Sequence, residues 1–408
     1  MKRSFKSPIA FSVFTLISLW LSLTAPAGTT LFSFNAGKEL FVIPDFEIPV
    51  AGASWVIFAI ALLATGFSWW FATQRKKTPL WLTAFLAFAL VQQVLVVLFA
   101  GHMFPVTTTL QGSLALAVPL IFGALAGVLS ERVGVVNIAI EGQLLAGAFA
   151  SALITSITHS LTIGLVAAAI SGALVAGILA VFSIKYVVDQ IIVGVVVNVL
   201  VIGLTSFFYS TVMARDLIAL NQPERFSQID IPLLSQIPII GPLLFSQTLI
   251  VYLMYAAVAV GYVALFKTRW GLRLRAVGEY PKAADTVGIK VYRTRYISVM
   301  LGGALAGLGG AFFTLGAVGS FSKEMTSGAG YIALAALIFG RWNPILATLA
   351  ALMFGFAQNL QSVLSIIGSD VPSQFLLMLP YALTVVAVAG LVGKVSGPAA
   401  TGKPYIKS

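Results

Sequence analysis

Long apolar runs recur along the chain, and they constrain its fold more than any other feature. Most of them reach the roughly 20 residues that an α-helix needs to cross the hydrocarbon layer of a membrane. Hydrophobic residues make up 59% of the 408 residues and charged residues only 9%, with a mean hydropathy of +1.01, which lies outside the range of soluble domains. The runs lie near residues 9–25, 52–72, 80–100, 109–129, 134–157, 161–183, 187–213, 247–266, 296–318, 325–340, 344–367 and 374–393.

These runs predict an all-α polytopic membrane protein with about 12 transmembrane helices, and no fewer than about 10. The run near 325–340 is short and glycine-rich, so we expect a broken or re-entrant helix there. The first run follows three basic residues, as in a signal sequence, but it is longer than a signal-sequence core. We therefore expect it to be an uncleaved first span.

Basic residues gather at one set of span ends, which predicts the orientation. If all the runs cross, 20 of the 24 Lys and Arg residues fall on the side that holds both termini. The positive-inside rule places that side in the cytoplasm. We expect a multi-pass protein of the cell membrane, in the lipid bilayer, with cytoplasmic N- and C-termini. The net charge of +11 is then a property of span ends and does not indicate nucleic-acid binding.

Two loops stand out between the predicted spans. Residues 214–246 contain four prolines and are too irregular to cross, so we expect them outside, where they offer a surface to an extracytoplasmic partner. Residues 267–295 form the one long, strongly charged stretch, and we expect this loop in the cytoplasm as a docking surface. Its basic residues are Lys267, Arg269, Arg273, Arg275, Lys282, Lys290, Arg293 and Arg295.

Small residues recur at intervals of four within several predicted spans. Such spacing lets helix backbones approach closely in lipid, where burial of apolar surface supplies little drive for association. It therefore predicts tight helix–helix packing. The series are Gly123 and Gly127, Ala168 and Gly172, and Gly302, Ala306 and Gly310.

Polar residues inside apolar runs are costly in lipid, so they are candidates for function. Glu141 follows Asn137 by four residues in the run 134–157, and on one helix the two side chains would share a face. Amides both donate and accept hydrogen bonds, which suits a passage for a hydroxyl-rich solute. The candidate pathway residues are Asn137, Glu141, Gly142, Asn198, Gln358 and Asn359.

A structural interpretation of the same residues stays open. Glu141 would then cap a broken helix or pair with Arg132, and the amides would bridge neighbouring helices.

Catalytic and metal-binding patterns are missing from the sequence. It has no cysteine, only two histidines, no HExxH or GxSxG motif, and no glycine-rich phosphate loop followed by Lys and Ser or Thr. We therefore predict no catalytic residue, no metal site and no ATP hydrolysis by this chain.

Four separated stretches resemble the permease subunits of bacterial ABC importers for simple sugars and nucleosides. They are ERVGVVNIAIEGQLLAGAFA at 131–150, DQIIVGVVVNVL at 189–200, GLRLRAVGEYPKAADTVGIKV at 271–291 and SGAGYIALAALIFGRWNP at 327–344. The resemblance implies a permease core over residues 108–395, followed by a cytoplasmic tail, 396–408. Residues 1–107, with three predicted spans, lie outside it as an N-terminal extension.

The resemblance also implies partners. A solute-binding lipoprotein would deliver the solute from outside, a second and different permease chain would complete the pathway, and separate ATPase subunits would hold ATP and Mg. The ATPase would dock on a short coupling helix between Gly278 and Gly288, which begins at Pro281. Within it, Ala283 and Ala284 would give a flat face. The coupling residues are Gly278, Glu279, Ala283, Ala284 and Gly288.

Three alternatives remain at this point. One is a secondary transporter with Glu141 as the carboxylate that couples to protons or sodium. Another is a branched-chain amino-acid permease of the same superfamily. The third is a membrane assembly subunit that conducts nothing.

Overall fold

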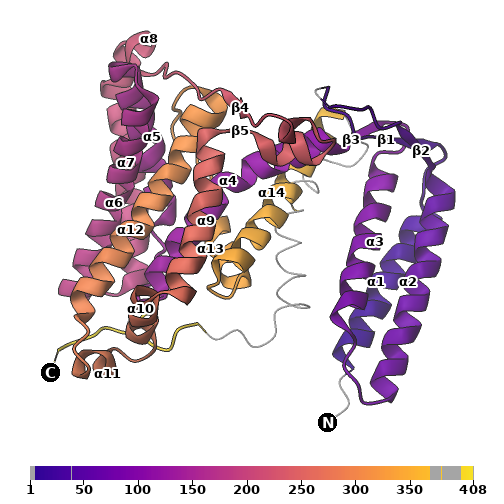
Figure 1. The fold of residues 1–408 in the computed structure, drawn as a ribbon, viewed down its shortest axis with the longest axis horizontal. Coiled ribbons are helices and arrows are strands. Elements are labelled where there is room, and N and C mark those ends of the chain that lie inside the picture. Colours follow the sequence, from indigo (N-terminus) through magenta and orange to yellow (C-terminus); the bar gives the residue numbers. More distant parts are fainter. Residues whose placement is uncertain (1–4, 38, 368–377, 379–396, 408) are drawn as a thin grey trace. The chain divides into compact units, whose positions relative to one another are not determined.

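The computed structural model describes residues 5–37, 39–367, 378 and 397–407 (Figure 1). The predicted span near 374–393 lies outside the described residues apart from Met378. Contacts divide the chain into two compact units. The first comprises the described residues of Met1–Gln111, Pro232–Leu244 and Leu360–Leu391, and the second those of Gly112–Ile231, Phe245–Asn359 and Val392–Ser408.

Three apolar helices form the core of the first unit: α1 (Lys6–Leu23), α2 (Val50–Thr73) and α3 (Leu80–Leu98). Helix α2 packs on both α1 and α3, around a cluster that includes Phe11, Ala61 and Leu86. The connections between helices form a small sheet that the apolar runs did not predict. Strand β1 (Thr29–Ser33) pairs antiparallel with β2 (Phe46–Pro49) and parallel with β3 (Met103–Pro105), with Leu31 opposite both Glu47 and Met103.

A buried glutamine joins the three helices. Gln93 of α3 donates through Nε2 to the carbonyl of Ser18 at 3.0 Å and the hydroxyl of Ser22 at 3.0 Å, both on α1, and to the carbonyl of Ser54 on α2 at 3.3 Å. Its Oε1 accepts from the Ser18 hydroxyl at 2.6 Å. In lipid such bonds contribute to helix association because apolar surface gains little from burial there.

Gln93→Leu is expected to lower the stability of this three-helix unit by about 0.6–2 kcal/mol, the range of interhelical hydrogen bonds in membranes. The neighbouring Gln92 is only half buried, so Gln92→Leu is the matched control. The stability of each variant is measured as the midpoint of thermal unfolding of the purified protein in detergent. Limited proteolysis of the segment from α1 to α3 shows whether this unit is the part that loosens. Equal midpoints for the two variants would contradict the role of Gln93.

The second unit is a helical bundle with one pair of short strands. Strand β4 (Gln228–Asp230) pairs antiparallel with β5 (Ser246–Thr248). Helices α4 and α14 belong to the unit from Gly112 onward and up to Asn359, respectively. The helices are α4 (Val106–Glu131), α5 (Ile140–Thr158), α6 (Leu161–Ala180), α7 (Gln190–Thr211), α8 (Leu217–Leu220), α9 (Leu249–Lys267), α10 (Arg269–Glu279), α11 (Pro281–Thr286), α12 (Val291–Ala311), α13 (Ala329–Phe339) and α14 (Pro344–Ile367).

Helix α12 packs closely on α5 and α6 through small residues. A Cβ atom at Gly172 of α6 would overlap the carbonyl oxygen of Gly303, and one at Gly307 would overlap that of Ala168. On another face of α12, a Cβ at Gly310 would overlap the carbonyl of Leu144 on α5. The predicted tight packing is confirmed, with Gly303 and Gly307 as the residues of α12 that meet α6.

The all-α polytopic fold class is confirmed. Within the described ranges, nine helices are long and apolar enough to cross a membrane. Helix α1 is slightly shorter than these, and α13 has 11 residues. The run 325–340 therefore holds a short helix, as its length and glycine content predicted.

Candidate functional site

A buried carboxylate caps the short helix α13. Glu141, in the first turn of α5, accepts through Oε1 from the hydroxyl of Thr326 at 2.6 Å and from the backbone N–H of Gly328 at 2.9 Å. Its Oε2 accepts from the N–H of Gly330 at 2.6 Å. A helix N-terminus carries a partial positive charge and unpaired N–H groups, so a carboxylate there is stabilised. The helix-capping interpretation of Glu141 is confirmed.

Asn198 of α7 joins the beginnings of α5 and α13. Its Oδ1 accepts from the N–H of Gly142 at 2.8 Å, and its Nδ2 donates to the carbonyl of Ile138 at 2.9 Å and the hydroxyl of Tyr331 at 3.2 Å. The Asn198 side chain is only 2% exposed. The amide therefore links the backbone at the start of α5 to a side chain in the first turn of α13.

Both helix starts lie part-way along the length of α7. Asn198 follows Gln190, the first residue of α7, by eight residues, which is roughly 12 Å along a helix axis. Helices α5 and α13 therefore begin within the apolar layer that α7 crosses, not at its edge. Interrupted helices that meet at depth are typical of solute and ion sites in transporters, because their free termini supply polar groups there.

The prediction that Asn137 and Glu141 share a helix face is wrong. Helix α4 ends at Glu131, and α5 begins only at Ile140, so Asn137 lies in the connection between them. Gly134, at φ +86°, turns the chain after α4. Asn137 instead exchanges two hydrogen bonds with the buried amide of Gln143, at 3.1 and 3.0 Å.

The charged loop folds into two short helices, α10 and α11. The hydroxyl of Thr268 caps α10 by accepting from the N–H of Gly271 at 3.1 Å. Pro281 occupies the first turn of α11, where its missing N–H costs nothing. Gly288 follows α11 at φ +84°, a conformation that glycine adopts without strain. The helix predicted between Gly278 and Gly288 is therefore present.

The two alanines of α11 differ in exposure. Ala283 is exposed, whereas Ala284 is 3% exposed and packs within the chain itself. The prediction that both alanines form one flat docking face is therefore wrong. Helix α11 packs on the bundle with Ala284 facing inward, so that only Ala283 of the two faces outward. Val287, 75% exposed, is an outward apolar residue of this loop. Glu279 is exposed.

Gly278 lies against the connection between α4 and α5. A Cβ atom there would overlap the carbonyl oxygen of Arg132. The guanidinium groups of Arg132 and Arg275 lie 5.5 and 5.3 Å from the ring centre of Phe266. Burial, and next the nearby Arg275, lower the pKa of Arg132, while Glu279 opposes this shift. Arg295, counted among the loop's basic residues, is buried and so contributes no surface charge.

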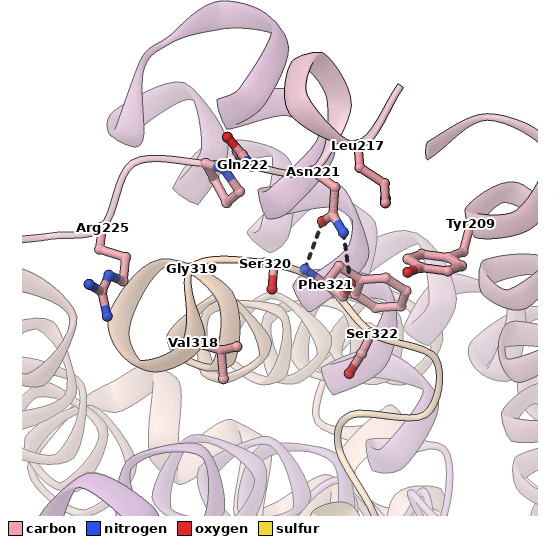
Figure 2. A pocket seen from close by; sticks show the side chains of 11 residues that line it. Tyr209, Leu217, Asn221, Gln222, Arg225, Val318, Gly319, Ser320, Phe321 and Ser322 are labelled. Carbon is pink, nitrogen blue, oxygen red and sulfur yellow. Dashed lines mark hydrogen bonds between the residues drawn. The ribbon is translucent and has the colours of Figure 1, made fainter. Parts of the chain in front are cut away.

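A pocket of about 690 Å³ is lined by Leu217 of α8, Asn221 and Phe321, among others (Figure 2). Helix α8 lies at the end of the second unit opposite α10 and α11 (Figure 1). Two hydrogen bonds join the segments on either side of the pocket. The side chain of Asn221 donates to the carbonyl of Phe321 at 2.9 Å and accepts from the N–H of Phe321 at 2.7 Å. The Phe321 ring packs on Phe149 and Tyr209. Arg225 lies at one side of the opening (Figure 2).

Comparisons with known proteins agree with this architecture. The model of a family described as branched-chain amino acid transport system / permease component matches residues 109–388, which is more than half of the chain. The chain belongs to this family. As a permease component of an ABC system, it is a multi-pass membrane protein that works with an ATPase and other subunits.

Several relatives of the permease are known. It is 44% identical to the guanosine ABC transporter permease protein NupQ of Bacillus subtilis, over 72% of this chain and 95% of that protein. It is 40% identical to the nucleoside ABC transporter permease protein NupC of Lactococcus lactis, over 71% of this chain and 94% of that protein. The putative glucose ABC transporter permease protein TsgC13 of Haloferax volcanii is 32% identical over 62% of this chain. No solved structure matches the permease.

The structure brings some of the predicted pathway residues together. Glu141, Gly142 and Asn198 form one cluster at the starts of α5 and α13. Asn359 of α14 instead donates to the hydroxyl of Ser113 on α4 at 3.4 Å. Gln358 is half buried on the same helix.

Sequence reasoning missed two members of the cluster. Thr326 donates its hydroxyl to Oε1 of Glu141, and the hydroxyl of Tyr331 accepts a hydrogen bond from Nδ2 of Asn198. The signal for both was the segment TSGAGY, because glycines before a short apolar helix indicate N–H groups that need an acceptor.

Proposed function

We propose that this permease is the membrane-crossing subunit of an ATP-driven importer of nucleosides. One observation carries the proposal: its similarity to permeases named for guanosine and for nucleosides extends over nearly the whole of those proteins. The match to a probable branched-chain amino acid permease, LivH of Methanocaldococcus jannaschii, covers only 17% of this chain. Nucleosides are therefore favoured over amino acids.

In the proposed assembly this permease works with three other kinds of subunit. ATPase subunits hold ATP and Mg and dock on α10 and α11, whose outward residues include Ala283 and Val287. A second permease, a different chain, completes the pathway. A solute-binding lipoprotein docks at the opposite end, over the pocket walled by Asn221 and Phe321. Both termini are then cytoplasmic, in agreement with the distribution of basic residues.

The cluster around Glu141 is the proposed solute site. Glu141 and Asn198 already use their polar atoms to hold two helix starts, so their role is to position the site. Tyr331 differs, because the residue is 49% exposed while its hydroxyl is hydrogen-bonded to Asn198. An aromatic ring held in place beside polar groups suits a nucleoside, whose base stacks and whose sugar forms hydrogen bonds.

Tyr331→Ala is expected to reduce nucleoside uptake by roughly 5- to 100-fold, because stacking on an aromatic side chain contributes about 1–3 kcal/mol per base. Tyr331→Phe keeps the ring and is expected to stay within about threefold of the unaltered permease, because it loses only one hydrogen bond. Concentration-dependent uptake in vesicles separates the two. Equal uptake by Tyr331→Ala and Tyr331→Phe would contradict stacking.

Reconstitution tests the proposed function directly. Liposomes would contain the permease, its partner permease and the ATPase, with the binding protein outside, and labelled guanosine would be supplied. Guanosine should accumulate with ATP inside, and not with ADP. Excess unlabelled nucleoside should compete, whereas leucine and glucose should not. Uptake that needs an ion gradient instead of ATP would overturn the proposal, and competition by leucine would overturn the substrate class.

A further inference from the structure

The C-terminal residues 397–407 are docked along the end of the bundle that carries α10 and α11 (Figure 1). The N–H of Ala400 donates to the carbonyl of Gly278 at 2.9 Å. Two residues on, the N–H of Gly402 donates to the carbonyl of Gly134 at 3.3 Å. The hydroxyl of Thr401 donates to the carbonyl of Glu131 at 3.4 Å. Three consecutive residues thus join the end of α10 to the connection between α4 and α5.

Aromatic side chains anchor the segment at both ends. Tyr405 is 5% exposed, with its ring centre 5.4 Å from that of Tyr292 on α12. The Tyr292 hydroxyl donates to the carbonyl of Tyr405 at 3.2 Å, and Asp285 of α11 lies beside the Tyr405 hydroxyl. At the other end, a Cβ atom at Gly397 would be 3.0 Å from the indole of Trp342.

Ordering a terminal segment costs conformational entropy, so such segments are poorly ordered unless specific contacts hold them. The contacts here are not to an arbitrary surface. They join the helix that carries Asp285 to the connection that contains Gly134, and this connection leads directly into the first turn of α5 and Glu141. A displacement of α10 and α11 would therefore reach the Glu141 cluster through two routes, the packing of Gly278 on Arg132 and the docked segment.

We propose that residues 397–407 are a strap that transmits movement of α10 and α11 to the α4–α5 connection, and so to the helix starts at Glu141. The strap rests on the proposed function, since it presupposes an ATPase acting on α11. It is a positioning element, not part of the solute site. Loss of the strap should lower the amount of solute transported per ATP while ATP hydrolysis continues. Loss of a purely structural element would lower both activities together.

Truncation after residue 396 tests the strap in the reconstituted complex. The ATPase should still co-purify, and ATP hydrolysis should stay within about twofold, while guanosine transported per ATP falls by roughly tenfold, within the range typical of coupling between sites. Unchanged transport per ATP, or loss of the ATPase from the complex, would overturn the strap. If the intact permease shows no ATP-dependent uptake, the proposed function fails, and the strap with it.

Two further experiments keep the strap testable if the truncated chain does not fold. Tyr405→Ala should lower transport per ATP at least threefold, whereas Tyr405→Phe, which keeps the ring contact with Tyr292, should restore it. Equal ratios for the two variants would overturn the anchoring by Tyr405.

The second experiment fixes the strap in place. The chain has no cysteine, so Glu279→Cys with Ala399→Cys can be bridged by a short bifunctional thiosulfonate, which links the two thiols through reducible disulfide bonds. The N–H of Ala399 lies 3.3 Å from Oε2 of Glu279. Because the strap stays docked during transport, uptake by the bridged double variant should stay within about twofold of the uptake by the same double variant before bridging, and each single variant treated with the reagent serves as a control. Uptake that the bridge blocks and thiol reduction restores would show that the segment must detach, which overturns the strap.

Discussion

Glu141→Gln is expected to reduce nucleoside uptake by roughly 30-fold while the permease still reaches the membrane. Glutamine keeps one oxygen, which can accept from Thr326 and Gly328, but it places an amide N–H₂ opposite the N–H of Gly330. A buried donor left unpaired costs about 2 kcal/mol, which corresponds to roughly 30-fold in an equilibrium between two conformations. The first turn of α13 should therefore detach from α5.

Two measurements distinguish this effect from a general loss of stability. Amide hydrogen exchange should increase at Gly328 and Gly330 and stay unchanged in α6 and α12. Glu324→Gln is the matched control, since Glu324 is an exposed carboxylate just before the same helix. Its uptake should equal that of the unaltered permease. Full uptake by Glu141→Gln, with normal exchange at Gly330, would show that the cap is dispensable.

Hydropathy and turn chemistry were sufficient to predict much of this fold. Within the described residues, most of the apolar runs correspond to long helices, because a span needs length and apolar composition, and both are visible in one sequence. The short helix α13 and the first turn of α11 at Pro281 were also predictable, since glycine and proline act through the local backbone. The orientation of the termini stays a prediction.

The interior of the Glu141 cluster was not predictable in the same way. The first residues of the run 134–157 are mostly apolar, so hydropathy does not show that the chain is non-helical before Ile140. Spacing along one helix therefore assigned Asn137 to the wrong neighbour. Its actual partner, Gln143, is six residues away, and only the non-helical path after Gly134 brings the two amides together.

Which residues of the charged loop are buried could not be predicted from the sequence either. Ala283 and Ala284 are chemically identical, and Arg295 resembles the other basic residues of its loop. Their different exposures arise from the bundle on which the loop packs. The docked C-terminal segment was missed for a related reason: its contacts are mostly through backbone groups, which leave no side-chain pattern.

Gly172→Ala is expected to destabilise the bundle by about 1–3 kcal/mol, the usual cost of adding a methyl group where no space exists. The new Cβ would overlap the carbonyl oxygen of Gly303 and lie 2.8 Å from Cα of Gly307. Because both neighbours are backbone, helices α6 and α12 would have to separate. The gain in helix propensity from glycine to alanine, at most about 1 kcal/mol, does not offset this.

Helix α6 supplies its own control for this prediction. A Cβ at Gly177 meets nothing within 4 Å, so Gly177→Ala makes the same chemical change in the same helix without a clash. The midpoint of thermal unfolding in detergent should fall for Gly172→Ala and should stay equal or rise for Gly177→Ala. A fall of the same size in both would mean that glycine is needed for helix flexibility and not for close approach. Because α12 also contacts α5 at Gly310, Gly172→Ala should lower uptake as well, by shifting the helix against which α5 positions Glu141.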